Sequence, residues 1–247
     1  MKMVEVKFDK NGFEKFKNVI GYLSNTFLEV AFDFQDRQGL NIMEIEQSNV
    51  MCVGVKFKPE FFSAIKLDKE KKEDVNLKYR LNIQNLKKVL GRCSGDVSMK
   101  FGDEVEIVSG KKNFRLAVIE SYGEKDFKMP NLTDSKVNFK VELKKIKEIL
   151  LDSLVIKGDS LVFDIKNKRV TAQTDTYSNN KYEGGFEIDA TGEAKSGFGT
   201  DFLSKVFINT PFKEATLFFG TNYPLRVVFE DDNVNATVVL APRVENT

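Results

Sequence analysis

The amino-acid sequence predicts an α+β protein with two similar domains, each an antiparallel sheet system with two helices packed on one face. Three observations support this prediction. Apolar and polar residues alternate over most of the chain, which is typical of half-buried strands. Four short segments instead space their apolar residues as an amphipathic helix does. The order of strands and helices in the first half recurs in the second half.

Six segments show the strand alternation most clearly, and turn signals at hairpin spacing separate such segments. Residues 36–39, 157–159 and 231–233 carry these signals. Strands joined by short turns pair antiparallel, so we expect meanders. The apolar positions of the six segments are Val4/Val6/Phe8, Leu28/Val30/Phe32/Phe34, Val97/Met99/Phe101, Phe114/Leu116/Val118, Leu161/Phe163/Ile165 and Ala236/Val238/Leu240.

Four helices are expected, at about residues 12–24, 82–93, 141–154 and 201–209. Asn82 is a suitable N-cap for the second helix, and Pro211 ends the fourth. Each helix has a single apolar arc and must bury it against another element. The arcs consist of Phe13, Phe16, Val19, Ile20 and Leu23; Ile83, Leu86, Val89 and Leu90; Leu143, Ile146, Ile149, Leu150 and Leu154; and Phe202, Leu203, Val206 and Phe207.

An internal repeat sets the domain organisation. Leu86 begins the run Leu-Lys-Lys-Val-Leu and is followed by Phe101-Gly102, while Leu203 begins Leu-Ser-Lys-Val-Phe and is followed by Phe219-Gly220 at almost the same spacing. The stretch between the copies carries Gly, Pro and charge without sustained alternation. We therefore expect an N-terminal domain at residues 1–118, a connector at 119–133 and a C-terminal domain at 134–247.

Composition excludes several classes of protein. The 38 basic and 37 acidic side chains nearly cancel, so no overall charge draws the chain to nucleic acid or a membrane surface. Histidine is absent, which removes the usual general base and imidazole metal ligand. Cys52 and Cys93 form no close-spaced metal or redox motif. We expect a soluble protein with no cofactor, no metal and no membrane-spanning segment.

The outward faces of the expected helices are basic, although the chain as a whole is nearly neutral. Nine basic side chains stand against four acidic ones there, Glu14, Glu148, Asp152 and Asp201. Without a base-reading motif, such a layer suits sequence-independent contact with phosphates; for a single lysine, an ordinary solvated face is the alternative. The nine candidates for DNA contact are Lys15, Lys17, Lys87, Lys88, Arg92, Lys144, Lys145, Lys147 and Lys205.

Two clusters of carboxylates offer a competing interpretation as an enzyme. Asp103, Glu104 and Glu106 form one cluster, and Asp231 and Asp232 form the other. Such groups can hold divalent cations for phosphodiester hydrolysis, as in a metal-dependent nuclease. Both clusters lie at expected hairpin turns, which favours solvated turn residues and a protein that is not an enzyme.

Several motifs resemble DNA sliding clamps of the proliferating cell nuclear antigen type. The terminal run 239–245, Val-Leu-Ala-Pro-Arg-Val-Glu, is similar to the closing signature of that family. Further similar stretches are Phe218-Phe219-Gly220, Tyr223-Pro224-Leu225, residues 39–50, residues 128–132 and residues 196–204. Their order and spacing agree with the repeat, and they cover essentially the whole chain.

The resemblance implies a ring of three subunits, with helices lining a hole for double-stranded DNA and sheets outside. Clients such as DNA polymerase, clamp loader, flap endonuclease and ligase would insert a short peptide under the connector. The implied peptide pocket comprises Ile45, Val50, Phe127, Met129, Pro130, Tyr223, Pro224, Leu240, Ala241 and Pro242.

The expected subunit interface joins one strand edge at Phe114, Arg115 and Leu116 to another at Lys181, Tyr182 and Glu183. Adjacent glycines in the second edge and the near-neutral charge leave a heterotrimer open beside a homotrimer. The alternatives in function are a clamp relative in checkpoint signalling or viral replication. The expected location is intracellular, in the cytoplasm or nucleoid if archaeal and in the nucleus if eukaryotic.

Overall fold

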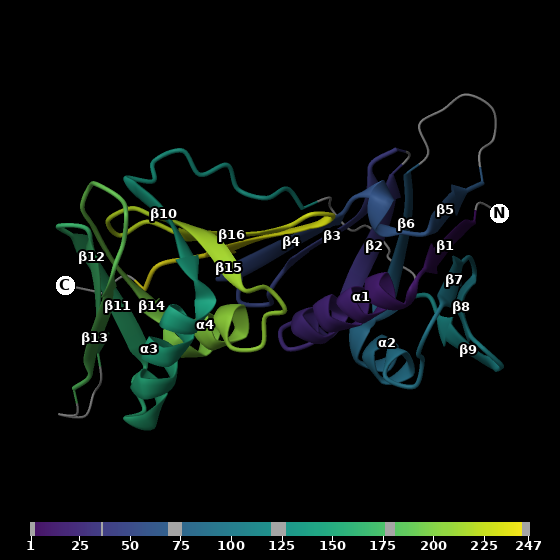
Figure 1. Ribbon diagram of the computed structural model, residues 1–247, viewed down its shortest axis with the longest axis horizontal. Coiled ribbons are helices and arrows are strands. Elements are labelled where there is room, and N and C mark those ends of the chain that lie inside the picture. Colours follow the sequence, from purple (N-terminus) through teal and green to yellow (C-terminus); the bar gives the residue numbers. More distant parts are fainter. Residues whose placement is uncertain (1–2, 36, 69–75, 120–126, 176–180, 244–247) are drawn as a thin grey trace. The chain divides into compact units, whose positions relative to one another are not determined.

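The computed structural model describes residues 3–35, 37–68, 76–119, 127–175 and 181–243 of the chain (Figure 1). These residues form two compact units, described here one at a time. Unit 1 consists of residues 1–44, 54–128 and 231–235, and unit 2 of residues 45–53, 129–230 and 236–247. Each unit thus includes a short hairpin segment from the other half of the sequence.

Unit 1 contains a five-stranded antiparallel sheet in the order β5-β1-β7-β8-β9 and the strand set β6-β2-β3. Helices α1 and α2 pack against each other. The elements are β1 (Val4–Phe8), α1 (Lys10–Leu23), β2 (Glu29–Gln35), β3 (Gly39–Ile45), β5 (Ala64–Leu67), β6 (Asn76–Asn82), α2 (Ile83–Leu90), β7 (Val97–Phe101), β8 (Glu104–Ser109), β9 (Lys112–Ala117) and the 3-10 helix η1 (Pro59–Phe61). Strand β4 (Met51–Phe57) has residues in both units, as do β3, β16 (Leu225–Asp231) and β17 (Val234–Leu240) through their ends.

Unit 2 repeats this plan with a four-stranded sheet, β13-β12-β11-β14, and a second strand set that includes β10-β15-β16. Helices α3 and α4 pack against each other as α1 and α2 do. The elements are β10 (Val137–Glu142), α3 (Leu143–Val155), β11 (Ser160–Lys166), β12 (Arg169–Asp175), β13 (Glu183–Glu187), β14 (Ala194–Gly199), α4 (Thr200–Phe207), β15 (Glu214–Phe219), β16 (Leu225–Asp231) and β17 (Val234–Leu240). The predicted α+β class with antiparallel sheets is confirmed.

The repeated Phe-Gly motif has the same role in both units. Phe101 ends β7 and its ring centroid lies 4.8 Å from that of Phe34 in the core of unit 1. Phe219 ends β15 and stacks on Phe139 with centroids 5.9 Å apart in unit 2. Each ring is almost fully buried, so the repeat seen in sequence marks equivalent core positions.

The helix boundaries follow local chemistry. Asn82 caps α2 as predicted, since its Oδ1 accepts a 2.9 Å hydrogen bond from the Asn85 amide, and Asp9 caps α1 in the same way through Gly12. The third helix begins later than the expected residue 141, at Leu143, because Val141 and Glu142 still pair with β15.

Two apolar residues expected on buried faces are exposed. Leu28 is 62% exposed because β2 begins one residue later, at Glu29. Leu154, expected on the buried arc of the third helix, is 37% exposed, and its neighbours Leu151 and Val155 are 51% and 81% exposed. The last turn of α3 therefore presents an apolar patch, Leu151, Leu154 and Val155.

Candidate functional site

Nine of the ten residues predicted to form the peptide pocket belong to unit 2. Their C-terminal members are held by backbone hydrogen bonds on two sides. The Ala241 amide donates to the Val50 carbonyl at 2.8 Å, and the Arg243 amide donates to the Gly197 carbonyl at 2.8 Å. Leu240 is fully buried, whereas Ala241 and Pro242 are half-buried. Leu240 thus supports the surface from beneath, and Ala241 and Pro242 form part of it.

The Tyr223-Pro224 turn is fixed by a serine hydroxyl. Ser196 donates to the Gly220 carbonyl at 2.9 Å and accepts from the Tyr223 amide at 3.1 Å. A Cβ at Gly220 would lie 2.8 Å from the Cβ of Tyr223, so glycine is needed where the Tyr223 side chain crosses the chain. Tyr223 and Pro224 stay half-buried and available at the surface of unit 2.

Met129 and Pro130, within the predicted connector, supply further apolar surface to the same unit. The Sγ atom of Cys52 lies 3.3 Å from Sδ of Met129, which positions the thioether over a buried thiol. Burial raises the pKa of the Cys52 thiol, so this cysteine acts as a packing residue. Ile45 is 38% exposed and Pro130 is exposed, which leaves apolar atoms open to a ligand.

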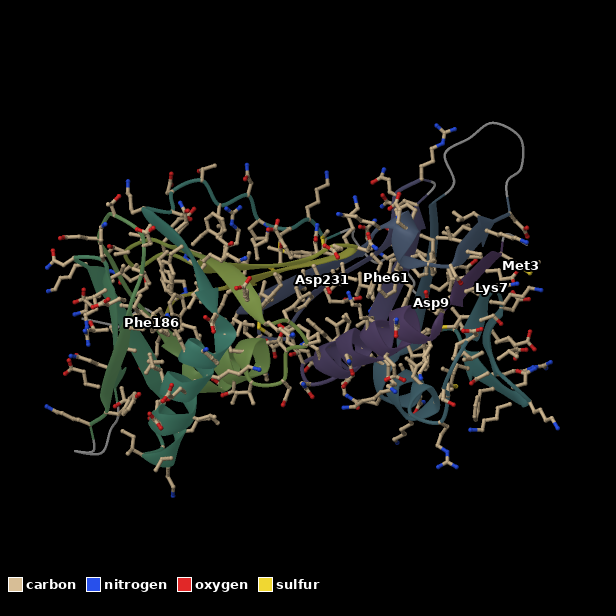
Figure 2. The ribbon with its side chains drawn as sticks, in the orientation of Figure 1. Met3, Lys7, Asp9, Phe61, Phe186 and Asp231 are labelled. Atoms are coloured by element: carbon tan, nitrogen blue, oxygen red, sulfur yellow. The ribbon has the colours of Figure 1, made fainter. Side chains whose placement is uncertain are left out.

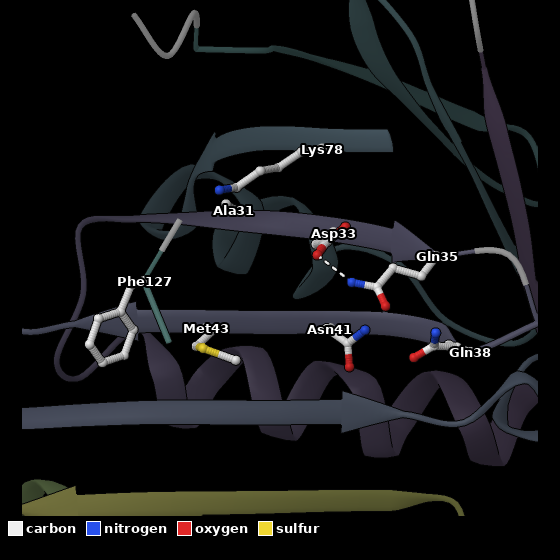
Figure 3. A pocket seen from close by; sticks show the side chains of 8 residues that line it. All are labelled: Ala31, Asp33, Gln35, Gln38, Asn41, Met43, Lys78 and Phe127. Atoms are coloured by element: carbon white, nitrogen blue, oxygen red, sulfur yellow. Dashed lines mark hydrogen bonds between the residues drawn. The ribbon is translucent and has the colours of Figure 1, made fainter. Parts of the chain in front are cut away.

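Phe127 is the one predicted pocket residue that the structure assigns to unit 1. There it lines a cavity of about 380 Å³ (Figure 3). Phe127 and Met43 lie at one end, while the other end is polar and includes Asp33, whose carboxylate accepts a 2.8 Å hydrogen bond from Gln35. Sequence reasoning missed this cavity, although the alternation at Val30, Phe32 and Phe34 already left Asp33 and Gln35 on the other, outward face of β2.

Three of the nine predicted DNA-contacting cations are neutralised by ion pairs within the chain. Lys15 on α1 lies 2.7 Å from Asp231, which Figure 2 labels, and this pair together with a hydrogen bond from the Asp232 amide holds the pKa of Asp231 below its usual range. Lys17 pairs with Glu14 at 2.6 Å. Lys144 pairs with Glu142 at 2.6 Å, which raises the pKa of the lysine and lowers that of the carboxyl group.

The other six cations have no ion-pair partner among the described residues. Lys205 lies 4.8 Å from the centroid of the Phe202 ring, and Lys145 lies 5.9 Å from that of Phe186. Lys87 and Lys88 on α2 and Arg92 just beyond it are exposed, and Lys147 on α3 is half-buried. Lys87, Lys88 and Arg92 therefore offer exposed positive charge on α2 and just beyond it, and Lys147 adds a half-buried cation on α3.

The predicted interface residues lie on two edge strands or directly before one, since Lys181 and Tyr182 immediately precede β13, which begins at Glu183. Strand β9, with Phe114, Arg115 and Leu116, ends the five-stranded sheet of unit 1, and β13 ends the four-stranded sheet of unit 2. Arg115 pairs with Glu104 at 3.3 Å. Edge strands leave backbone groups of one side unpaired, so both can add a further strand.

Tyr182 links the β13 edge to helix α3. Its hydroxyl donates to Asp152 at 3.1 Å, and partial burial and this contact raise the pKa of Tyr182 to about 12. A side chain at Gly184 would clash with the Tyr182 hydroxyl, and one at Gly185 would clash with the Val170 carbonyl. The adjacent glycines thus make room for the tyrosine and for close strand pairing, at the edge next to Lys181 and Glu183.

Neither carboxylate cluster forms a metal centre among the described residues, where no group of three or more Cys, Asp or Glu side chains is arranged to hold an ion. Asp231 pairs with Lys15, Glu104 pairs with Arg115, and Glu106 accepts a 2.6 Å hydrogen bond from Asn113. Within the described parts of the chain, no helix is long and apolar enough to cross a membrane.

Comparison with known proteins identifies relatives along the whole chain. The family model described as proliferating cell nuclear antigen, N-terminal domain, matches residues 3–148. A DNA polymerase sliding clamp from Pyrococcus horikoshii is 26% identical, with 98% of each chain covered. The crystal structure of proliferating cellular nuclear antigen from Entamoeba histolytica has a TM-score of 0.86 at 18% identity and covers 99% of this chain and 100% of its own. A structure of the C-terminal region of FEN-1 bound to Archaeoglobus fulgidus PCNA has a TM-score of 0.83 at 19% identity, covering 99% and 100%.

Proposed function

Because this chain belongs to the proliferating cell nuclear antigen family and is a DNA sliding clamp, we propose that it encircles double-stranded DNA as a trimer and tethers replication enzymes there without catalysing a reaction itself. The observation that carries this proposal is the family match over residues 3–148, more than half of the chain. The repeated two-unit architecture supports it, since a ring can be built from copies of one such plan.

Contact with DNA is proposed for the cations on the helices. Lys87, Lys88, Arg92 and Lys147 have no ion-pair partner among the described residues, and none belongs to a motif that reads base edges. Mobile lysines that exchange between phosphates give weak and salt-sensitive contact. A ring prevents escape by its closure, so such contact is sufficient and lets the clamp slide. Lys15, Lys17 and Lys144 contribute less because carboxylates already neutralise them.

Client binding is proposed for the apolar surface of unit 2 formed by Ile45, Val50, Met129, Pro130, Tyr223, Pro224, Ala241 and Pro242, with Leu240 beneath it. The backbone carbonyls of Val50 and Gly197 and the hydroxyl of Ser196 accept hydrogen bonds that hold this surface in place before a ligand arrives, which lowers the entropic cost of binding. A short peptide with aliphatic and aromatic anchors fits such a surface. DNA polymerase, clamp loader, flap endonuclease and ligase are the proposed clients.

Assembly is proposed through the edges of β9 and β13, on one subunit and the next. Lys111 and Lys112 make the start of the first edge basic, where Arg115 is already paired with Glu104, while Glu183 and Glu187 make the second largely acidic despite Lys181. Because one chain carries both edges, copies of it can join head to tail, which favours a homotrimer. A heterotrimer and a specialised clamp in checkpoint signalling or viral replication are the alternatives. We place the protein inside the cell, with DNA.

Two measurements test this proposal. Native mass spectrometry should give a single species at three times the 28.1 kDa chain mass. The protein, loaded with a clamp loader onto nicked circular DNA, should stay bound after gel filtration and leave when a restriction enzyme cuts the circle. A monomer, or equal retention on circular and linear DNA, would contradict the ring. DNA cleavage with added Mg²⁺ that requires Asp231 and Asp232 would instead support the nuclease.

A further inference from the structure

The guanidinium group of Arg226 makes no hydrogen bond or ion pair with the part of the chain that the structure describes. It lies on β16, directly opposite Phe218 on β15, and the central guanidinium carbon is 3.9 Å from the centroid of the Phe218 ring. Its Nε atom is buried without a hydrogen-bond partner. No ion pair or side-chain hydrogen bond joins Arg226 to any described residue.

Among the described residues, no carboxylate forms an ion pair with Arg226. On the other side of Phe218 the cross-strand neighbour is Asn138, which is neutral. The carboxylate of Glu214, at the far end of β15, forms an ion pair with Lys140, with Nζ and Oε2 2.5 Å apart. A guanidinium that is partly removed from water and has no anion beside it is a ready receptor for one.

The stacking on Phe218 also fixes the orientation of the group. An arginine laid flat on an aromatic ring keeps its plane, so its in-plane N–H groups point in defined directions. The side chain is half-buried, which leaves part of this donor edge open to solvent. A planar carboxylate, with two oxygens, matches two parallel N–H donors.

Arg226 lies beside the proposed client surface. Leu225, between Pro224 and Arg226, is buried, so the side chains of residues 224 and 226 lie on the outer side of the strand. Two residues along a strand span about 7 Å, one dipeptide step of an extended ligand. A peptide anchored at Tyr223 and Pro224 therefore needs little further length to bring a side chain to Arg226.

We propose that Arg226, stacked on Phe218, binds the carboxylate of an Asp or Glu residue that flanks the apolar anchors of a client peptide. The inference rests on the proposed client surface. It adds a charged specificity determinant: peptides with an acidic residue at the matching flanking position are preferred over peptides with its neutral amide. The contact forms two charge-assisted hydrogen bonds and leaves the apolar anchors unchanged.

The test uses the full-length protein and anchor peptides in which each flanking position in turn carries Glu or Gln. Calorimetry should show, at one position, tighter binding of the Glu peptide by roughly tenfold, the size of a hydrogen bond to a charged group. This preference should disappear in Arg226→Gln and fall in Phe218→Leu, which keeps the arginine but removes its platform. Arg169→Gln is the matched control on β12, exposed and in the other sheet of unit 2, and should keep the preference.

The outcomes separate the two proposals. Anchor peptides that bind without distinguishing Glu from Gln at any position would overturn the role of Arg226 and leave the client surface intact. Absence of binding by every anchor peptide would overturn both. Inorganic phosphate is a further probe. If it binds the wild-type protein but not Arg226→Gln, and no peptide shows a Glu preference, Arg226 is a phosphate site and the proposed carboxylate ligand is overturned. If Arg226→Gln and Arg169→Gln unfold at the same temperature, the loss of the Glu preference in Arg226→Gln is not caused by impaired folding.

Discussion

Lys15 on α1 donates a 2.7 Å hydrogen bond to Asp231 at the end of β16, a carboxylate 216 residues later in the sequence. Lys58 adds a second connection to the same turn, since its Nζ donates to the Asp232 carbonyl at 2.8 Å. The 231–235 segment is thereby fixed within unit 1. From sequence alone, Lys15 was assigned to DNA contact, and Asp231 was assigned to a solvated turn or a metal cluster.

Replacing Lys15 with Met should lower the stability of the protein in a pH-dependent way. The pKa of Asp231 is lowered in the folded state, so its contribution is fully present above about pH 4 and disappears as the pH falls through the folded pKa. Since both side chains are partly exposed, the expected loss at neutral pH is only about 0.5 kcal/mol. Urea unfolding at several pH values measures the difference in the free energy of unfolding between Lys15→Met and wild type. A difference between variant and wild type that persists unchanged at the lowest pH would contradict the pairing.

Removing the unpaired helix lysines should weaken the salt dependence of DNA association. In the triple variant Lys87→Ala, Lys88→Ala and Lys147→Ala, each lost phosphate contact should reduce the slope of log affinity against log salt by about 0.9. Fluorescence anisotropy with duplex DNA between about 50 and 200 mM salt measures this slope. The control replaces Lys100, Lys166 and Lys195, which are exposed on strands, and should retain it. Equal slopes in all three proteins would show that α2 and α3 do not face DNA.

A proline at the β9 edge should disrupt assembly. Leu116→Pro removes a backbone donor and restricts φ in an edge strand, so the addition of a neighbour's strand is disfavoured. Light scattering should show monomer where wild type gives trimer. Leu116→Val keeps the amide and the strand preference and should remain trimeric. If Leu116→Pro is folded and still trimeric, the interface lies on other strands.

A charge at the client surface should abolish peptide binding while leaving the ring intact. In Met129→Glu the new carboxylate would have to be buried under an apolar anchor, and the expected loss is at least about 2 kcal/mol, or roughly thirtyfold in affinity. Calorimetry with an anchor peptide measures it. Met43→Glu makes the same change at an exposed methionine in unit 1, outside the proposed client surface, and should bind normally. Full affinity in Met129→Glu would move the docking site away from the connector.

Much of the fold could be predicted from local pattern. Alternation at Val97, Met99 and Phe101 located β7, and the spacing of Ile83, Leu86 and Leu90 located α2 with its cap at Asn82. These signals are readable because burial of one face imposes a period of two on strands and about 3.6 on helices. The same logic revealed the repeat that places Phe101 and Phe219 in equivalent cores.

The candidate site was predictable in composition but not in geometry. Motifs located Tyr223, Pro224 and the 240–242 segment, and the structure unites them in one unit with Met129. The separation of Phe127 into unit 1 had no local signal. The charge pattern named nine helix cations, yet it did not show which of them carboxylates neutralise, since Asp231 lies 216 residues from Lys15 in the sequence and Glu142 was not among the four carboxylates counted.

By itself the sequence determined the class of fold, the duplication, the basic character of the helices and the resemblance to sliding clamps, because each depends on which residues are near each other in the chain. Only the tertiary structure decided that residues 45–53 and 231–235 join the unit opposite to their sequence neighbours, that Lys15 is paired, and that Arg226 stacks on Phe218 without a described polar partner. These facts depend on hydrogen-bonded pairing between distant strands and on side-chain packing across it, which a one-dimensional period does not encode.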